Sequence, residues 1–197
     1  MSRWLAAIWG AALLALTACQ PAPQPPAFQA TDITGAGFAR DFRLTDHNGR
    51  ARTLADFRGK VVAVFFGYTH CPDVCPTTLS DFAAALKQLG ADAGRVQVIF
   101  VTLDPQRDTP DILKQFVPAF NPSFLGMYAD PDALQRLAKE YKVVYQKTSV
   151  KAADDYLIDH SAGTYVYDPA GHLRLLMPYG SGPDAIAHDL KILLAAS

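Results

Sequence analysis

The sequence is poor in cysteine, with only three among its 197 residues. An iron–sulfur cluster held by four thiolates is therefore excluded. The sequence also lacks any concentration of Lys and Arg, since 18 basic and 19 acidic side chains are spread along the chain and leave a formal net charge of -1. Nucleic acid is not an expected partner, because phosphate binding needs clustered cations.

A long hydrophobic run is also missing. The longest apolar stretch, Trp4–Leu16, follows a single cation at Arg3 and precedes Leu16-Thr17-Ala18-Cys19. It has 13 residues, whereas a bilayer-spanning helix needs roughly 20, so a permanent transmembrane helix is the weaker alternative. We interpret residues 1–18 as a lipoprotein-type signal peptide and expect lipidation at Cys19.

The segment that follows is rich in proline and short of large apolar residues. We expect residues 19–38 to form a lipid-anchored linker whose proline-rich part is extended by about 3 Å per residue. This interpretation places the protein on the periplasmic side of a bacterial membrane. Residues 39–197 are enough for one globular domain, and half of the whole sequence is apolar.

Two buried strands and a preceding hairpin are predicted in the first half of that domain. Residues 42–54 alternate around Asn48 and Gly49, a two-residue turn typical of a β-hairpin. The runs Val61–Phe66 and Val96–Leu103 are rich in β-branched and aromatic residues, which is typical of central strands covered on both faces.

Helical periodicity separates and follows these strands. Apolar residues over 79–89 have helical spacing, and Thr78 with Asp81 matches a capping box at the start. Further helices are predicted from Pro110 and Pro131, because proline suits the first helical position.

Two more strands and a helix close the chain. Residues 163–167 and 173–177 flank a turn and predict an antiparallel hairpin, and residues 186–194 carry the stripe of a terminal helix. The element order predicts an α/β fold with a thioredoxin-like layout: a central mixed β-sheet flanked by helices, with an N-terminal β-hairpin.

Cys71 and Cys75 lie between the first buried strand and the following helix, at the edge of an α/β sheet where redox and ligand sites gather. A helix N-terminus there stabilises thiolates. If the first turn includes Cys71, both cysteines share one helical face. If the helix begins at Thr78, both sit on a loop. An inert disulfide staple is an alternative, although closing so short a loop gains only roughly 2 kcal/mol.

Two thiolates suit monovalent copper or zinc as well as a cluster. A structural zinc site would need four ligands and so both His70 and His160, and His70 is awkwardly placed beside Cys71. Copper is satisfied by two sulfurs and one imidazole. His160 lies in a predicted loop, 156–161, that can return to the same sheet edge, although a surface position in a turn is also consistent with its spacing.

Three stretches of the sequence resemble the motifs of the Sco/SenC family in order and spacing. They are Gly67–Leu79, Leu103–Pro110 and Asp155–His160, within a likeness that spans about residues 40 to 192. The resemblance implies a copper ion bound by Cys71, Cys75 and His160, with Cys71 and Cys75 also able to form a redox-active disulfide. It places Asp104 beside the site, where the carboxylate would contact a partner protein or orient the histidine.

The family resemblance further implies assembly of the binuclear copper centre of cytochrome c oxidase. The chain would act as a copper metallochaperone for the copper-bearing subunit, or as a thiol-disulfide reductase that keeps the acceptor's cysteines reduced. Copper donor and thiol reductant proteins are possible further partners. Classical enzyme activity is not expected, beyond possible thiol-disulfide oxidoreductase activity. A peroxidase is disfavoured, because Thr69 is two residues before Cys71 and Phe65 replaces the expected proline.

Overall fold

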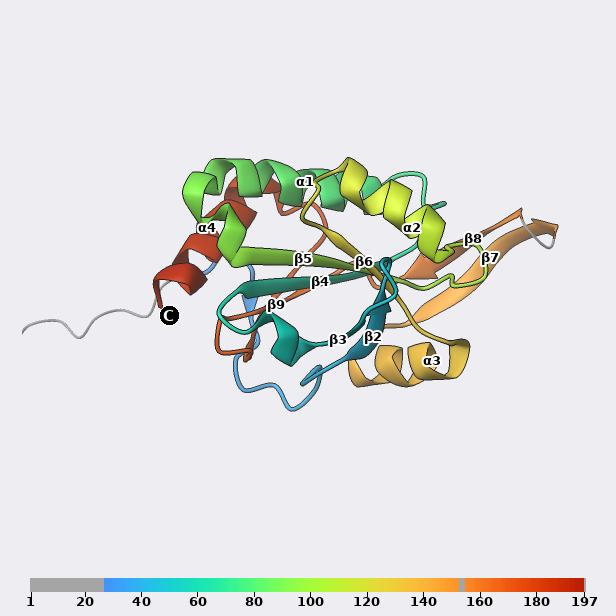
Figure 1. Cartoon of the computed structure of the whole chain (residues 1–197), viewed down its shortest axis with the longest axis horizontal. Coiled ribbons are helices and arrows are strands. Elements are labelled where there is room, and N and C mark those ends of the chain that lie inside the picture. The colour runs from blue at the N-terminus through green and yellow to red at the C-terminus, as the bar shows by residue number, and fades with distance from the viewer. Residues whose placement is uncertain (1–26, 153–154, 197) are drawn as a thin grey trace, which may run out of the picture.

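The computed structural model describes residues 27–152 and 155–196. The predicted signal peptide and Cys19 lie outside these residues. Within the described part of the chain, eight strands form one mixed sheet in the order β1-β10-β9-β4-β5-β6-β2-β3, and β7 and β8 form a separate two-stranded sheet (Figure 1). The predicted architecture, a mixed central sheet flanked by helices, is confirmed.

The strands are β1 Thr31–Asp32, β2 Arg43–Asp46, β3 Ala51–Thr53, β4 Val61–Gly67, β5 Val96–Thr102, β6 Leu125–Tyr128, β7 Tyr145–Ala152, β8 Asp155–His160, β9 Thr164–Tyr167 and β10 Leu173–Met177. The α-helices are α1 Val74–Leu89, α2 Pro110–Phe116, α3 Pro131–Glu140 and α4 Gly182–Ala195, with 3-10 helices at Leu54–Phe57, Gly90–Arg95 and Val117–Ala119. Strands β4, β5 and β6 run parallel, and the other pairs in the large sheet are antiparallel.

Helices cover both faces of the sheet, with α1, α2 and α4 on one side and α3 on the other (Figure 1). Successive side chains of β4 therefore point to opposite faces of the sheet and join different apolar clusters. Phe65 belongs to the apolar cluster that includes helices α1 and α4, whereas Phe66 belongs to the cluster that includes Tyr141 after α3. The uninterrupted apolar run of β4 therefore follows from burial on both faces.

The predicted helix starts at the two prolines are confirmed. The side chain of Thr109 accepts a hydrogen bond from the N–H of Ile112 at the start of α2. Asp130 likewise accepts from the N–H of Ala133 at the start of α3. The prolines need no hydrogen-bond partner at this position, because the first N–H groups of a helix have none within it.

The predicted start of α1 at Thr78 is wrong. The helix begins at Val74, so Cys75 lies in its first turn and Cys71 in the loop before it. The Thr78 hydroxyl donates to the carbonyl of Val74 at 2.8 Å and is therefore bonded inside the helix. Proline at the third helical residue is tolerated because its missing N–H is among those that the first turn leaves free.

The segment before the site histidine is a strand rather than a loop. Strands β7 and β8 form a hairpin that projects from one end of the molecule (Figure 1). His160 is the last residue of β8 and pairs with Tyr145. The sequence analysis did not predict this hairpin because its composition is polar, and neither strand carries the long apolar run of a central strand.

Part of the predicted linker packs against the domain. Phe28 and Ala30 contact the apolar cluster under α1 and α4, and β1 adds to the sheet beside β10. The buried carboxylate of Asp189 accepts hydrogen bonds from the N–H groups of Gln29 and Ala30. A search of the described residues finds no helix with the length and apolar character needed to cross a membrane.

Candidate metal and thiol site

Three predicted site residues come together at the carboxyl end of β4. Cys71 lies in the loop after β4, Cys75 in the first turn of α1, and His160 at the end of β8. One potential ligand atom from each lies within 4.8 Å of the others. The side chains therefore converge from two segments that are 85 residues apart in the chain.

Cys75 is fully buried and sits against the backbone of β4. A Cβ atom added at Gly67 would lie 2.7 Å from Cys75 Sγ and 2.8 Å from Phe100 Cε2. Such distances are shorter than van der Waals contact, so only glycine leaves room for the sulfur here. Gly67 thus sets the depth of Cys75 in the site.

The two thiols differ in acidity. A hydrogen bond from the Cys75 thiol, two backbone N–H groups and the charge of His160 lower the pKa of Cys71 to about 5, although partial burial opposes this shift. The same bond to Cys71, together with burial, raises the pKa of Cys75. At neutral pH the reduced pair holds a Cys71 thiolate beside a Cys75 thiol.

Alkylation of the reduced protein by iodoacetamide is expected to show this difference. The rate at Cys71 should rise as pH increases through about 5 and then level off, because the thiolate is the nucleophile. Cys75 should stay unmodified, since its side chain is buried. Peptide mass spectrometry after timed labelling from about pH 4 to pH 9 measures both rates.

The matched variant is Cys75→Ala, which removes the hydrogen-bond donor. Its Cys71 midpoint should move up toward the ordinary thiol value of about 8.5. A wild-type midpoint already near that value would contradict the assigned thiolate.

His160 presents one ring nitrogen to the sulfurs. Its Nε2 lies 3.6 Å from Cys75 Sγ, and its Nδ1 lies 3.0 Å from the carbonyl oxygen of Ser161. A proton on Nδ1 satisfies that carbonyl, so Nε2 is the ring nitrogen directed toward the thiols. The rings of Phe65 and Tyr68 meet the imidazole at 6.1 Å between centroids and restrict its rotation.

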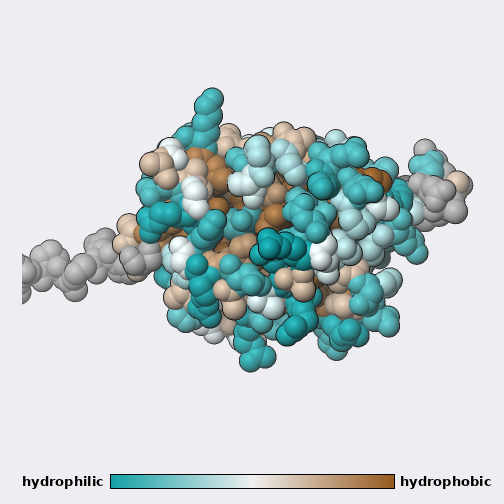
Figure 2. Space-filling view, in the orientation of Figure 1, coloured by the Kyte–Doolittle hydropathy of each residue, from teal (hydrophilic) through white to brown (hydrophobic). Residues whose placement is uncertain are grey.

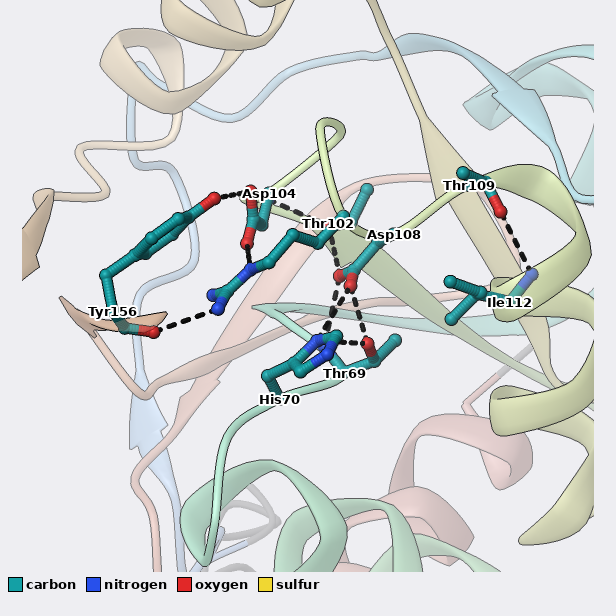
Figure 3. A network of polar contacts seen from close by, with 9 residues as sticks. Thr69, His70, Thr102, Asp104, Asp108, Thr109, Ile112 and Tyr156 are labelled. Atoms are coloured by element: carbon teal, nitrogen blue, oxygen red, sulfur yellow. Dashed lines mark hydrogen bonds and ion pairs between the residues drawn. The ribbon is translucent and has the colours of Figure 1, made fainter. Parts of the chain in front are cut away.

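A buried carboxylate that the sequence analysis did not single out holds the cysteine loop in place. Asp108 accepts hydrogen bonds from the hydroxyl and N–H of Thr69 and from the hydroxyl of Thr102 (Figure 3). It therefore ties the residues after β4 to the end of β5. The signals in the sequence were its position after a buried strand and within the motif Leu103–Pro110.

Asp104 does not reach the three ligand atoms directly. It is 2% exposed, and its carboxylate accepts from the hydroxyl of Tyr156 at 2.7 Å and from the guanidinium of Arg107 (Figure 3). Arg107 also donates to the carbonyl of Tyr156. Asp104 thus holds β8, the strand that ends at His160, and its burial removes the carboxylate from direct partner contact.

His70 lies outside the group of three. Its side chain is 51% exposed, and its Nδ1 is 3.8 Å from the carboxylate of Asp108. The ring is also within 3.1 Å of the Thr69 hydroxyl. These contacts direct Nδ1 of His70 toward Thr69 and Asp108, whose hydrogen bonds hold the cysteine loop in place.

The site opens into a groove of about 350 Å³ between the cysteine loop and β8. Its walls include Cys71, Val74, Leu157 and His160, so one sulfur and the imidazole border the open space. Two sulfurs and one imidazole are soft and borderline ligands that suit copper. The predicted choice of copper is consistent with this set of donors.

The sequence model of the family SCO1/SenC matches residues 30–195. Among curated proteins, a mitochondrial SCO2 homologue from Bos taurus is 40% identical over 133 residues, which cover 66% of this chain and 50% of the relative. A SCO2-like protein from Rickettsia felis is 32% identical over 77% of this chain and 74% of its own length. The chain spans about half the length of the mammalian relatives that it matches.

Solved structures agree with these matches. Copper-bound ScoI of Bradyrhizobium japonicum is 40% identical, covers 77% of this chain and 96% of its own, and superposes with a TM-score of 0.70. The apo Sco1 protein of Thermus thermophilus is 39% identical over 85% of this chain and 97% of its own, with a TM-score of 0.75. The predicted thioredoxin-like fold and the predicted family resemblance are thereby confirmed.

Proposed function

This chain belongs to the SCO1/SenC family, and from that premise we propose that it carries copper on Cys71, Cys75 and His160. The acceptor that we propose is the copper-bearing subunit of cytochrome c oxidase. The observation that carries the proposal is the convergence of two sulfurs and an imidazole within 4.8 Å. Copper is bound in the related ScoI structures from Bradyrhizobium japonicum and Arabidopsis thaliana, which supports the same cargo here.

The acidity of the two thiols prepares them for different steps of copper uptake. Cys71 is already a thiolate at neutral pH, whereas Cys75 must release its proton when the metal binds. His160 supplies a ring nitrogen, Nε2, and the Ser161 carbonyl fixes the orientation of the ring. Because Cys71 and His160 border the groove while Cys75 is buried, acceptor ligands would displace Cys71 or His160 first.

A thiol-disulfide reductase is the second candidate, and the low pKa of Cys71 favours it. The Cys71 thiolate would attack an acceptor disulfide, forming a mixed disulfide and releasing one acceptor thiolate. Cys75, after losing its proton, would then attack the Cys71 sulfur and release the second acceptor thiol. The chain would end as a disulfide and would require a thiol reductant protein before another cycle.

The proposed location rests on the sequence. A lipid on Cys19 would hold the domain at the periplasmic side of a bacterial membrane. The proline-rich residues that follow would act as a spacer before the chain joins the sheet at β1.

A transfer assay with the soluble domain separates the two candidates. Copper-loaded wild-type protein is expected to metalate the reduced copper-bearing domain of cytochrome c oxidase, followed by its absorption spectrum. His160→Ala should lose this transfer, because the ion would keep only two protein ligands. The same variant should still reduce the oxidised acceptor, since that exchange requires only the cysteines.

Normal copper transfer by His160→Ala would contradict the chaperone proposal. Reduction of the oxidised acceptor by wild type without any copper transfer would favour the reductase.

A further inference from the structure

A second groove lies beside the site histidine but does not include it. It has a volume of about 790 Å³ and runs between α3 and the start of β7. Arg136, Lys139 and Lys142 line it together with apolar residues that include Val143 and Val144. No carboxylate is among the residues that line the groove.

Acidic side chains lie outside this groove, and Asp41 and Glu140 border the adjoining hollow that Arg136 also lines. Neither Arg136 nor Lys139 makes an ion pair with a described residue. Glu140, the acidic neighbour on α3, is within 3.8 Å of Arg40 instead. Cations gathered in a concave surface attract an anionic partner.

The backbone places one of the cations in an unfavourable conformation. Lys142 follows α3 with a φ of 54°, a left-handed position that glycine usually occupies at the end of a helix. A side chain there costs about 1 kcal/mol. The ammonium of Lys142 lies 4.1 Å from the centre of the Phe38 ring, a cation–π contact that restrains this side chain.

Apolar surface accompanies the charge. Val144 is 73% exposed, the largest value among the exposed large hydrophobic residues of the described chain. Hydrophilic side chains cover most of the face seen in Figure 2, with apolar side chains in smaller patches between them. Cations beside an exposed valine fit a protein segment that carries both carboxylates and apolar side chains.

The groove is linked to the site through the β7–β8 hairpin. Tyr145, which lines the groove, is the direct cross-strand partner of His160. Ser161 donates its N–H to the carbonyl of Val144 at 2.9 Å, and its hydroxyl accepts from the N–H of Val144. A partner lying in the groove would therefore reach the site across the width of one hairpin.

We propose that this groove docks an acidic segment of the copper acceptor and thereby orients the acceptor's ligands toward His160. The inference rests on the proposed function. Asp73 and Asp159 are exposed at the groove of the site itself and would repel the same acidic segment. The two charged regions together favour a single orientation of the acceptor.

The test is the affinity of the full folded domain for the copper-bearing domain of cytochrome c oxidase, measured by calorimetry at low and high salt. Arg136→Glu with Lys139→Glu is expected to weaken the complex by about tenfold or more at low salt. The control is Lys87→Glu with Lys191→Glu, the same charge change on exposed lysines of α1 and α4, which should alter affinity by less than about threefold.

Lys142→Gly provides a second variant, because glycine suits the left-handed backbone and should preserve folding. It should weaken the complex without lowering the thermal midpoint. Equal weakening by the groove and control variants would overturn the proposal, as would the absence of a wild-type complex. Binding of wild type to phosphatidylglycerol vesicles that the groove variant loses would also overturn it, in favour of a membrane contact.

Copper titration of the same proteins keeps the two proposals separate. The groove variants should bind copper like wild type, because none of the three cations is among the proposed ligands. Failure of wild type to bind copper would refute the proposed function. Normal copper binding with unchanged acceptor affinity in the groove variants would refute the docking inference alone.

Discussion

Copper binding by the reduced domain is expected to fall by more than about 100-fold when Cys71→Ser, Cys75→Ser or His160→Ala is introduced. Loss of a partner around a ligand typically lowers metal affinity by 10- to 100-fold, and loss of a ligand itself should exceed that range. Competition for monovalent copper with a chromogenic chelator measures each affinity.

His70→Ala is the matched control for His160→Ala. It removes an imidazole next to Cys71 that is 51% exposed and outside the group of three converging ligands. Its copper affinity should stay within about tenfold of wild type, the lower end of the effects of residues around a ligand. A larger loss in His70→Ala than in His160→Ala would exchange the roles assigned to the two histidines.

Gly67→Ala is expected to lower the free energy of unfolding by about 1–3 kcal/mol and to weaken copper binding. The new methyl group would lie 2.7 Å from Cys75 Sγ and 2.8 Å from the Phe100 ring. Both neighbours are fully buried, so neither can move without displacing other core residues. Urea denaturation of the reduced apo protein measures the stability, and the chelator competition above measures the copper affinity.

Gly37→Ala is the control for this substitution, because an added Cβ there meets nothing within 4 Å. It should change the free energy of unfolding by less than about 0.5 kcal/mol. Unchanged stability and copper affinity in Gly67→Ala would show that the close approach of β4 to Cys75 does not position the sulfur.

Local sequence patterns were sufficient for the elements that have local causes. The buried run of β4 and the prolines at the starts of α2 and α3 carry their signals within a few residues. The position of Cys71 and Cys75 between a strand and a helix follows from the same patterns. The β7–β8 hairpin was missed because it is polar, and the start of α1 because Thr78 imitates a cap.

The sequence by itself thus determined the fold class and the position of the two thiols between a strand and a helix, since periodicity and helix-start signals are short-range. Only the tertiary structure decided that His160 faces Cys75, because that contact joins residues 85 positions apart. It also decided that Asp104 accepts a hydrogen bond from Tyr156 and that Asp108 accepts one from Thr69. These contacts span 52 and 39 positions of the chain. Such pairings depend on which strand ends meet at the sheet edge, and no spacing within one segment encodes that.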